Sequence, residues 1–292
     1  AYLCSSAPFG NSRRISCAGA AIADGTAPGR LCLKGLTRPT FSLRMGALLD
    51  SGFSRHFIRP YIRHNHIPME GYERVNYRSF NDFFTRKRRA EALHIDMEPT
   101  HLISPCDSLL SAYRITPESR FEIKHCAYSL ESLLRDRPLA ERYAGGLCLI
   151  FRLTPRHYHR YCYIDDGRKG DSFPLDGVLH SVRPMCIGSM PVFVENQREY
   201  TVMDTARFGR VTQVEVGALM VGKICNTPGQ GRIRRGEEKG HFAFGGSTII
   251  LLLEPGRVQL NSEIFRRTAR GQELPVRQGQ QIGTAHDEED MP

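Results

Sequence analysis

The sequence predicts an α+β fold, in which an N-terminal helical segment precedes a β-rich body. Apolar residues recur at helical spacing between residues 41 and 66. Beyond about residue 100, short apolar runs alternate with Gly, Pro and Asp, as strands and turns do. The clearest runs cover residues 147–153 and 248–253, and the second has the length of a buried strand. Residues 1–40 lack periodicity and are expected to form a loose arm, with some of the Arg and Ser content of a targeting segment.

The composition favours a basic protein of ordinary globular type. Its 292 residues carry 40 Lys and Arg against 31 Asp and Glu, a formal charge of +9. Such a surface attracts polyanions, but zinc-finger spacing and interleaved aromatic and basic residues are absent, so no nucleic-acid partner is expected. Nine cysteines at wide spacing, with no C-x-x-C pair, predict reduced thiols rather than a disulfide framework or a zinc site.

The helical region, residues 41–100, has two interpretations. Its apolar stripe is interrupted by Arg55, Arg59 and Arg63, and Pro60 is expected to kink or divide it. The favoured interpretation is a surface helix with its stripe on the core. The alternative is a basic amphipathic helix on anionic lipid. The later basic run, residues 86–89, is interpreted as a solvated face, with phosphate contact as the alternative.

Two short helices are predicted outside that stripe. Phe80, Phe83 and Phe84 stand at i, i+3 and i+4. Ser129 is a candidate N-cap for a helix over residues 129–135. The acidic residues 287–291 are expected to fray. No apolar run reaches the roughly 18 residues of a membrane-spanning helix.

The most informative tetrapeptide is Gly245-Gly246-Ser247-Thr248, between two apolar segments. Alone it is compatible with a hairpin turn. A hydroxyl after a flexible glycine can also attack the preceding carbonyl carbon and convert the peptide into an ester. Elimination then leaves a dehydroalanine, which hydrolyses to a pyruvoyl group and ammonia. Taken alone, Asp107 is a turn residue, and His157 with His159 lacks a third ligand, so no metal site is predicted.

Six segments together resemble the phosphatidylserine decarboxylase family, in order and in spacing. They are 80–86 (FNDFFTR, against F-N-E-F-F-x-R), 104–108 (SPCDS, against S-P-A-D-G), 128–134 (YSLESLL), 154–160 (TPRHYHR, against x-P-R-D-Y-H-R), 216–222 (V-G-A-x-x-V-G) and 245–248 (GGST, against L-G-S-T). The resemblance extends from about residue 48 to about residue 279.

The resemblance implies a mainly antiparallel β body and self-cleavage between Gly246 and Ser247. A β-rich catalytic domain over residues 101–292 would then be divided into a β subunit, 1–246, and an α subunit, 247–292. The family's Asp-His-Ser triad carries over to Asp107 and Ser247. Its processing His does not, because Y-H-R-x-H ends here in Cys162, while His159 matches the other His. The favoured assignment makes His159 the base in both steps, oriented by Asp107, with Cys162 as a less favoured substitute.

The activity that this resemblance implies is conversion of phosphatidylserine to phosphatidylethanolamine and CO2. It would proceed through a Schiff base with a pyruvoyl group made from Ser247, with no external cofactor. The expected partners are phosphatidylserine, an anionic membrane on whose cytoplasmic face the protein lies peripherally, and the chain's own subunits; a homo-oligomer is left open.

One alternative is decarboxylation of a soluble amino acid. Another is an unprocessed, non-catalytic binding protein, suggested by Cys162 and by Gly245 in place of the usual Leu. A serine hydrolase has little support, since G-x-S-x-G is absent around Ser247.

Overall fold

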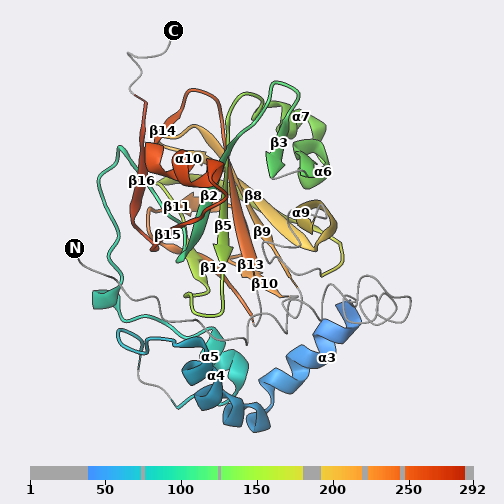
Figure 1. Ribbon diagram of the computed structural model, residues 1–292, viewed down its shortest axis with the longest axis vertical. Helices are drawn as coiled ribbons and strands as arrows, with labels where there is room; N and C mark the ends of the chain where they lie inside the picture. Colours follow the sequence, from blue (N-terminus) through green and yellow to red (C-terminus); the bar gives the residue numbers. More distant parts are fainter. Residues whose placement is uncertain are drawn as a thin grey trace, which may run out of the picture.

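The centre of the molecule is an eight-stranded sheet in which all neighbouring strands are antiparallel. The computed structural model describes residues 39–73, 76–123, 126–179, 192–218, 223–243 and 247–286 (Figure 1). The predicted α+β class, with its antiparallel β body and N-terminal helices, is confirmed. In spatial order, the strands are β11 (Gly231–Ile233), β7 (Gly167–Leu175), β8 (Arg198–Thr205), β9 (Arg210–Val216), β13 (Ser247–Leu253), β5 (Leu147–Leu153), β2 (Ser108–Arg114) and β15 (Leu274–Val276).

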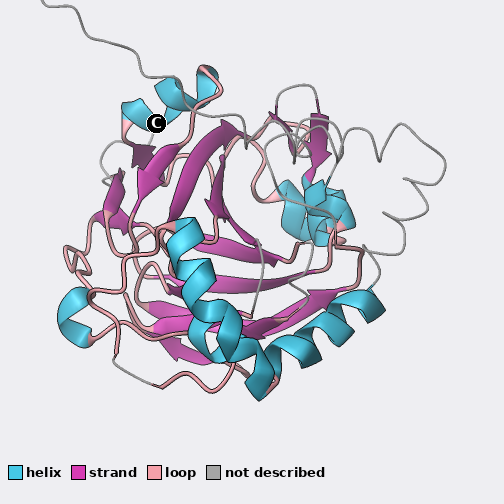
Figure 2. Ribbon diagram, turned by 60° about the horizontal axis from the view of Figure 1, so that its bottom comes forward, coloured by secondary structure: helices cyan, strands magenta, loops and turns pink. Residues whose placement is uncertain are grey.

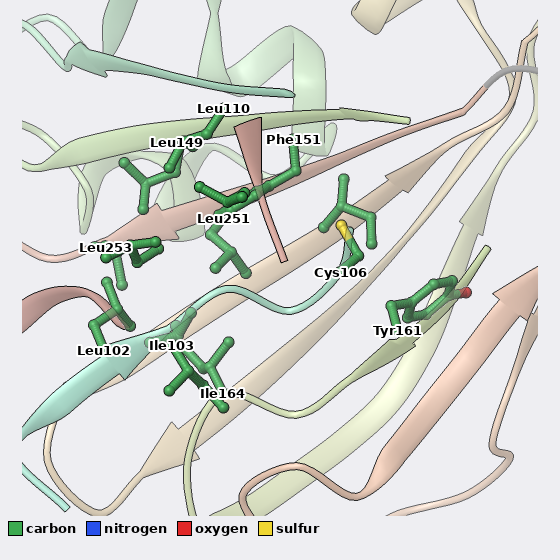
Figure 3. Packing of buried hydrophobic residues seen from close by; sticks show 14 of the residues in the cluster. Leu102, Ile103, Cys106, Leu110, Leu149, Phe151, Tyr161, Ile164, Leu251 and Leu253 are labelled. Atoms are coloured by element: carbon green, nitrogen blue, oxygen red, sulfur yellow. The ribbon is translucent and has the colours of Figure 1, made fainter. Parts of the chain in front are cut away.

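One face of this sheet is covered by two small sheets and by helix α10 (Ser262–Ala269). The small sheets are β10-β12-β6 and β1-β16-β14. Figure 3 shows the apolar cluster between these layers, with Leu149, Phe151 and Leu251 of the large sheet facing Ile103, Cys106 and Ile164. The strands concerned are β1 (His101–Ile103), β6 (Arg160–Cys162), β10 (Ile224–Asn226), β12 (Glu238–Phe242), β14 (Val258–Leu260) and β16 (Gln281–Ala285).

The other face packs on a second apolar cluster formed with short helices and a hairpin. The helices are α6 (Leu130–Leu134), α7 (Arg137–Glu141) and α9 (Val192–Glu195), and the hairpin is β3 (Arg120–Ile123) with β4 (Cys126–Ser129). Helix α6 confirms the prediction from Ser129, whose hydroxyl accepts a hydrogen bond from the Ser132 N–H at 3.4 Å.

Strand β13 lies between β5 and β9, and all of its residues are buried. Because both faces of the large sheet are covered, its side chains are apolar on either side, which explains the uninterrupted run 248–253. The predicted buried strand is therefore confirmed. Its first residue is Ser247, so the candidate nucleophile is held at the start of the most protected strand of the sheet.

The N-terminal helices lie across one end of the body (Figures 1 and 2). They are α3 (Pro39–Asp50), η1 (Gly52–Phe57), α4 (Ile58–Asn65), α5 (Phe80–Phe84) and η2 (Ala90–Ala92). The chain divides at Ser51, not at Pro60, which stands in the first turn of α4, where no intrahelical N–H bond is lost. None of the helices in the described part of the chain is both long enough and apolar enough to cross a bilayer.

Helix α5 confirms the prediction for residues 80–84. The Ser79 hydroxyl caps it by accepting the Asp82 N–H at 3.2 Å. Its three phenylalanines are buried against Leu49 and Ile58. The predicted arm up to residue 38 and the acidic tail from residue 287 lie outside the described residues, as do Val221 and Gly222.

Candidate functional site

Ser247 combines complete burial with an unpartnered hydroxyl. It is 0% exposed, and its Oγ has no hydrogen-bond partner among the described residues. It pairs with Leu153 of β5, and its side chain lies on the same face as Ile249 and Leu251, that of the cluster containing Cys106 and Cys162. Gly245 and Gly246 lie outside the described residues, so the predicted cleavage bond is not described on its carbonyl side.

His159 ends a loop that begins beside Ser247 and is hydrogen-bonded at its other end to strand β12. The loop leaves β5 after Leu153, the partner of Ser247, and its last carbonyl, that of His159, accepts the Phe242 N–H at 3.0 Å. The His159 ring is fully buried and packs on Phe84 of α5, with ring centroids 4.1 Å apart.

The His159 imidazole is neutral. Burial lowers its pKa well below the usual value, and the nearby Arg86 guanidinium lowers the pKa further. Neither ring nitrogen makes a hydrogen bond of normal geometry to a described residue. A neutral imidazole keeps one nitrogen lone pair, so His159 is able to take up a proton inside the site.

Asp107 is buried directly before β2, and its carboxylate is already bound. Both oxygens accept hydrogen bonds from the Arg88 guanidinium, and Oδ1 also accepts the Gln278 N–H at 2.9 Å. The hydrogen bond by which Asp107 was expected to orient His159 is therefore not formed in this structure. Asp107 precedes Ser108 of β2, and Ser108 lies two strands from Ser247, a separation of about 10 Å at normal strand spacing.

Cys162 lies beside the Asp107 loop, because its N–H donates to the Pro105 carbonyl at 2.9 Å. The thiol is fully buried, and burial raises its pKa to about 12, although the Gln278 side chain offsets part of this effect. Cys162 is thus a neutral thiol at physiological pH. A neutral thiol is a poor proton acceptor, which weighs against Cys162 as a replacement for the family's processing His.

His157 occupies the position at which the family pattern has Asp. Its Nδ1 accepts the Thr154 N–H at 3.0 Å, so the ring proton is on Nε2. Burial lowers the pKa of His157 to about 4, which is consistent with that fixed tautomer, because protonation of Nδ1 would break the bond. His157 therefore presents a hydrogen-bond donor, not a base. In the described part of the chain, no three potential metal ligands cluster.

The basic run 86–89 differs from its interpretation as a solvated face. Lys87 and Arg89 are exposed, but Arg86 is buried and lies 4.5 Å from the centroid of the Tyr72 ring. Arg88 binds Asp107 and lies 4.8 Å from the Tyr158 ring centroid. Two guanidiniums turn inward because aromatic faces and a buried carboxylate are there to receive them.

Sequence reasoning missed two of the residues at this site. Arg88 stands in a basic run beside the F-N-D-F-F segment, which pointed to a role. Nothing in the sequence indicated that it would pair with Asp107. Gln278 carried no such signal, because it approaches Asp107 through its backbone N–H.

The site combines a buried serine hydroxyl, without a partner among the described residues, with a buried neutral imidazole. A nucleophile and a proton acceptor are the two groups that a self-processing protein requires.

Comparison with known proteins agrees with this class. The model of the phosphatidylserine decarboxylase family matches residues 80–284. The chain is 40% identical over 260 residues to phosphatidylserine decarboxylase proenzyme 2 of Clostridium acetobutylicum, covering 89% of each chain. It is 39% identical over 251 residues to the phosphatidylserine decarboxylase proenzyme of Chlamydia muridarum, covering 83% of this chain and 82% of that protein. The chain belongs to the phosphatidylserine decarboxylase family.

Proposed function

We propose that this chain is a precursor that cleaves itself between Gly246 and Ser247 and then decarboxylates phosphatidylserine to phosphatidylethanolamine. The observation that carries the proposal is the buried Ser247 hydroxyl at the start of β13, without a partner among the described residues, in a chain that belongs to this family. The proenzyme names of the relatives support both the processing and the substrate.

Cleavage requires only groups of the chain and water. The Ser247 Oγ attacks the Gly246 carbonyl carbon, its proton passes to a base, and the C–N bond breaks to give an ester and a free amine. Loss of the Ser247 Cα proton then expels the Gly246 carboxylate and leaves a dehydroalanine. Water converts this residue to a pyruvoyl group and releases ammonia. We assign the base to His159, because it is neutral and neither ring nitrogen makes a hydrogen bond of normal geometry to a described residue.

The residues present fit a pyruvoyl group at position 247. The group would supply the ketone that condenses with the substrate amine and accepts electrons as CO2 leaves. Burial of Ser247 and His159 at 0% exposure limits the access of bulk water to the reacting carbon. The neutral imidazole of His159 can hold and return the proton that the product needs. The His157 Nε2–H, on the loop that joins β5 to His159, is a candidate contact for an anionic headgroup.

The surface of the N-terminal helices supports peripheral attachment to the cytoplasmic face of an anionic membrane. Phe53 is 65% exposed and Phe57 is 47% exposed, although aromatic side chains are usually more buried. Arg55, Arg59 and Arg63 are exposed on the same segment. Exposed aromatic and basic side chains together are typical of interfacial segments on anionic lipid. These helices pack on α5, whose Phe84 contacts His159, so the surface lies one helix layer from the site.

Intact-mass measurement of the purified protein tests this proposal. The expected result is two fragments, 1–246 and one that starts at residue 247 with a ketone in place of its amine, together with CO2 release from phosphatidylserine in anionic vesicles. Ser247→Ala should stay in one piece and release none. A single uncleaved chain would favour the non-catalytic alternative, and turnover of a free amino acid without vesicle binding would favour the soluble substrate.

A further inference from the structure

A fully buried ion pair lies next to the strand that carries Ser247. The Lys239 Nζ donates to the Glu215 Oε1 at 2.8 Å, and the two side chains are 1% and 0% exposed. Glu215 pairs with Ile249 of β13. Ser247 is two residues from Ile249 on the same face, so Glu215 and Ser247 are diagonal neighbours, about 7–8 Å apart.

Polar side chains around this pair form a connected network. The Glu215 Oε1 also accepts from the Gln213 side chain at 2.8 Å, and its Oε2 accepts from the Asn226 Nδ2 at 2.9 Å. The Asn226 Oδ1 in turn accepts from the Lys239 Nζ at 2.9 Å and from the Tyr161 hydroxyl at 3.0 Å. Figure 3 shows that hydroxyl pointing out of the apolar cluster.

This network joins two different sheets. Gln213 and Glu215 belong to β9 of the large sheet, whereas Asn226, Lys239 and Tyr161 belong to β10, β12 and β6 of the small sheet. The two halves of the candidate site are divided in the same way. Ser247 is on the large sheet, while Cys162 is on β6 of the small sheet and His159 directly precedes that strand. Tyr161 stands between His159 and Cys162 in the sequence.

Stability is a weak reason to keep such a pair. Removing two charges from water costs much of what their attraction returns, and apolar residues of similar volume often leave the fold equally or more stable. Apolar packing has little directional preference. Hydrogen bonds are directional, so they can fix where the two sheets meet.

We propose that the Glu215–Lys239–Asn226 bridge is a positioning element for self-cleavage. It fixes the small sheet, with the His159 loop, against the start of β13, so that the base reaches the Ser247 hydroxyl. The inference rests on the proposed function, because it concerns the geometry of that reaction.

The main test replaces the charged pair of the bridge with apolar residues of similar size, in Gln213→Leu/Glu215→Met/Lys239→Met, while Asn226 keeps its hydrogen bonds to Tyr161 and Glu199. Gln213 is included so that its amide does not lose its acceptor. We expect a melting temperature at or above that of the unaltered protein, together with cleavage about a hundredfold slower, the scale expected when reacting groups are misplaced by about 1 Å. A merely structural role would change the melting temperature and leave the cleavage rate of the folded protein unaltered.

Tyr161→Phe is the second variant, and it decides the question if the triple variant does not fold. It removes only the hydrogen bond from Tyr161 to Asn226, and we expect a folded protein that cleaves several-fold more slowly. The matched control is Arg142→Met/Glu254→Gln, which breaks an ion pair directly after the opposite end of β13 and should cleave at the unaltered rate.

The outcomes separate the two proposals. If the unaltered protein never cleaves, the proposed function fails. If it cleaves, and either bridge variant is folded and cleaves at the same rate, the bridge has no positioning role and the inference is overturned.

Discussion

The guanidinium of Arg88 binds both carboxylate oxygens of Asp107 and thereby joins the chain after α5 to the loop before β2. This ion pair is largely buried, with side-chain exposures of 19% and 10%. It ties the N-terminal helical region to the candidate site, as does the packing of Phe84 on His159. The site is therefore assembled from segments that are distant in the sequence.

Replacing Arg88 with Met should lower the free energy of unfolding by about 2–3 kcal/mol, because the Gln278 N–H is then the one donor that the buried carboxylate of Asp107 keeps among the described residues. Urea unfolding measures the change, in the Ser247→Ala background that keeps the chain in one piece. Lys87→Met, at the exposed neighbouring position, should change stability by no more than about 0.5 kcal/mol. Equal effects of the two substitutions would contradict this account of Arg88.

The two candidate bases are distinguished by substitution. His159→Gln should slow self-cleavage by about 10²–10⁴-fold, the usual contribution of a positioned acid or base. Cys162→Ala should leave the rate within about threefold, since burial raises the pKa of this thiol to about 12 and keeps it protonated. Band intensities on denaturing gels, followed over time after purification, give both rates. The reverse ranking would identify Cys162 as the base.

Stability should fall as the solution is acidified through the range in which free histidine titrates. Burial lowers the pKa of His157 to about 4, whereas in the unfolded chain it is about 6.5, so the unfolded state binds more protons between these values. The contribution of His157 to the free energy of unfolding is present above about pH 6.5 and is lost as the pH falls toward 4. It amounts to about 3 kcal/mol in total.

His157→Gln isolates that contribution, because the Gln oxygen can still accept the Thr154 N–H. Between pH 7 and pH 4.5, this variant should lose about 2–3 kcal/mol less stability than the protein with His157. Urea unfolding at both pH values, again in the Ser247→Ala background, gives the difference. Parallel pH profiles would mean that His157 is not held neutral by the fold.

Membrane attachment should depend on the exposed aromatic side chains of η1. Phe53→Ser/Phe57→Ser removes two such side chains and should weaken binding to anionic vesicles about a hundredfold or more, at roughly 1.5 kcal/mol or more for each lost ring. Co-sedimentation with vesicles measures the affinity for the membrane. Phe173→Ser, at a 48% exposed aromatic on β7, is the matched control and should bind as before. If all three proteins bind alike, the N-terminal helices are not the contact surface.

Much of the architecture was predictable because it depends on local sequence. The run 248–253 predicted a buried strand, and the spacing of Phe80, Phe83 and Phe84 predicted α5, since both patterns reflect regular backbone periods. Ser129 marked the start of α6 for a similarly local reason, the need to satisfy the first N–H groups of a helix.

The charged side chains could not be placed in the same way. Arg86 and Arg88 turn inward because of Tyr72, Tyr158 and Asp107, and no pattern within the run 86–89 identifies those partners. Gln213 and Glu215 alternate with apolar residues in β9, which is typical of a strand with one face in water. Their face is instead covered by the small sheet, and Lys239 supplies the buried counter-charge.

The central place of β13 bears on what the proposed cleavage would leave behind. A cut before Ser247 would free one end of a strand that would remain hydrogen-bonded to β5 along one edge and to β9 along the other. The short C-terminal piece also supplies β14, β15 and β16 to the sheets around it. Breaking one covalent bond would thus leave nearly all of the packing in place, and the nicked molecule should travel as a single particle in native gels until a denaturant pulls the pieces apart.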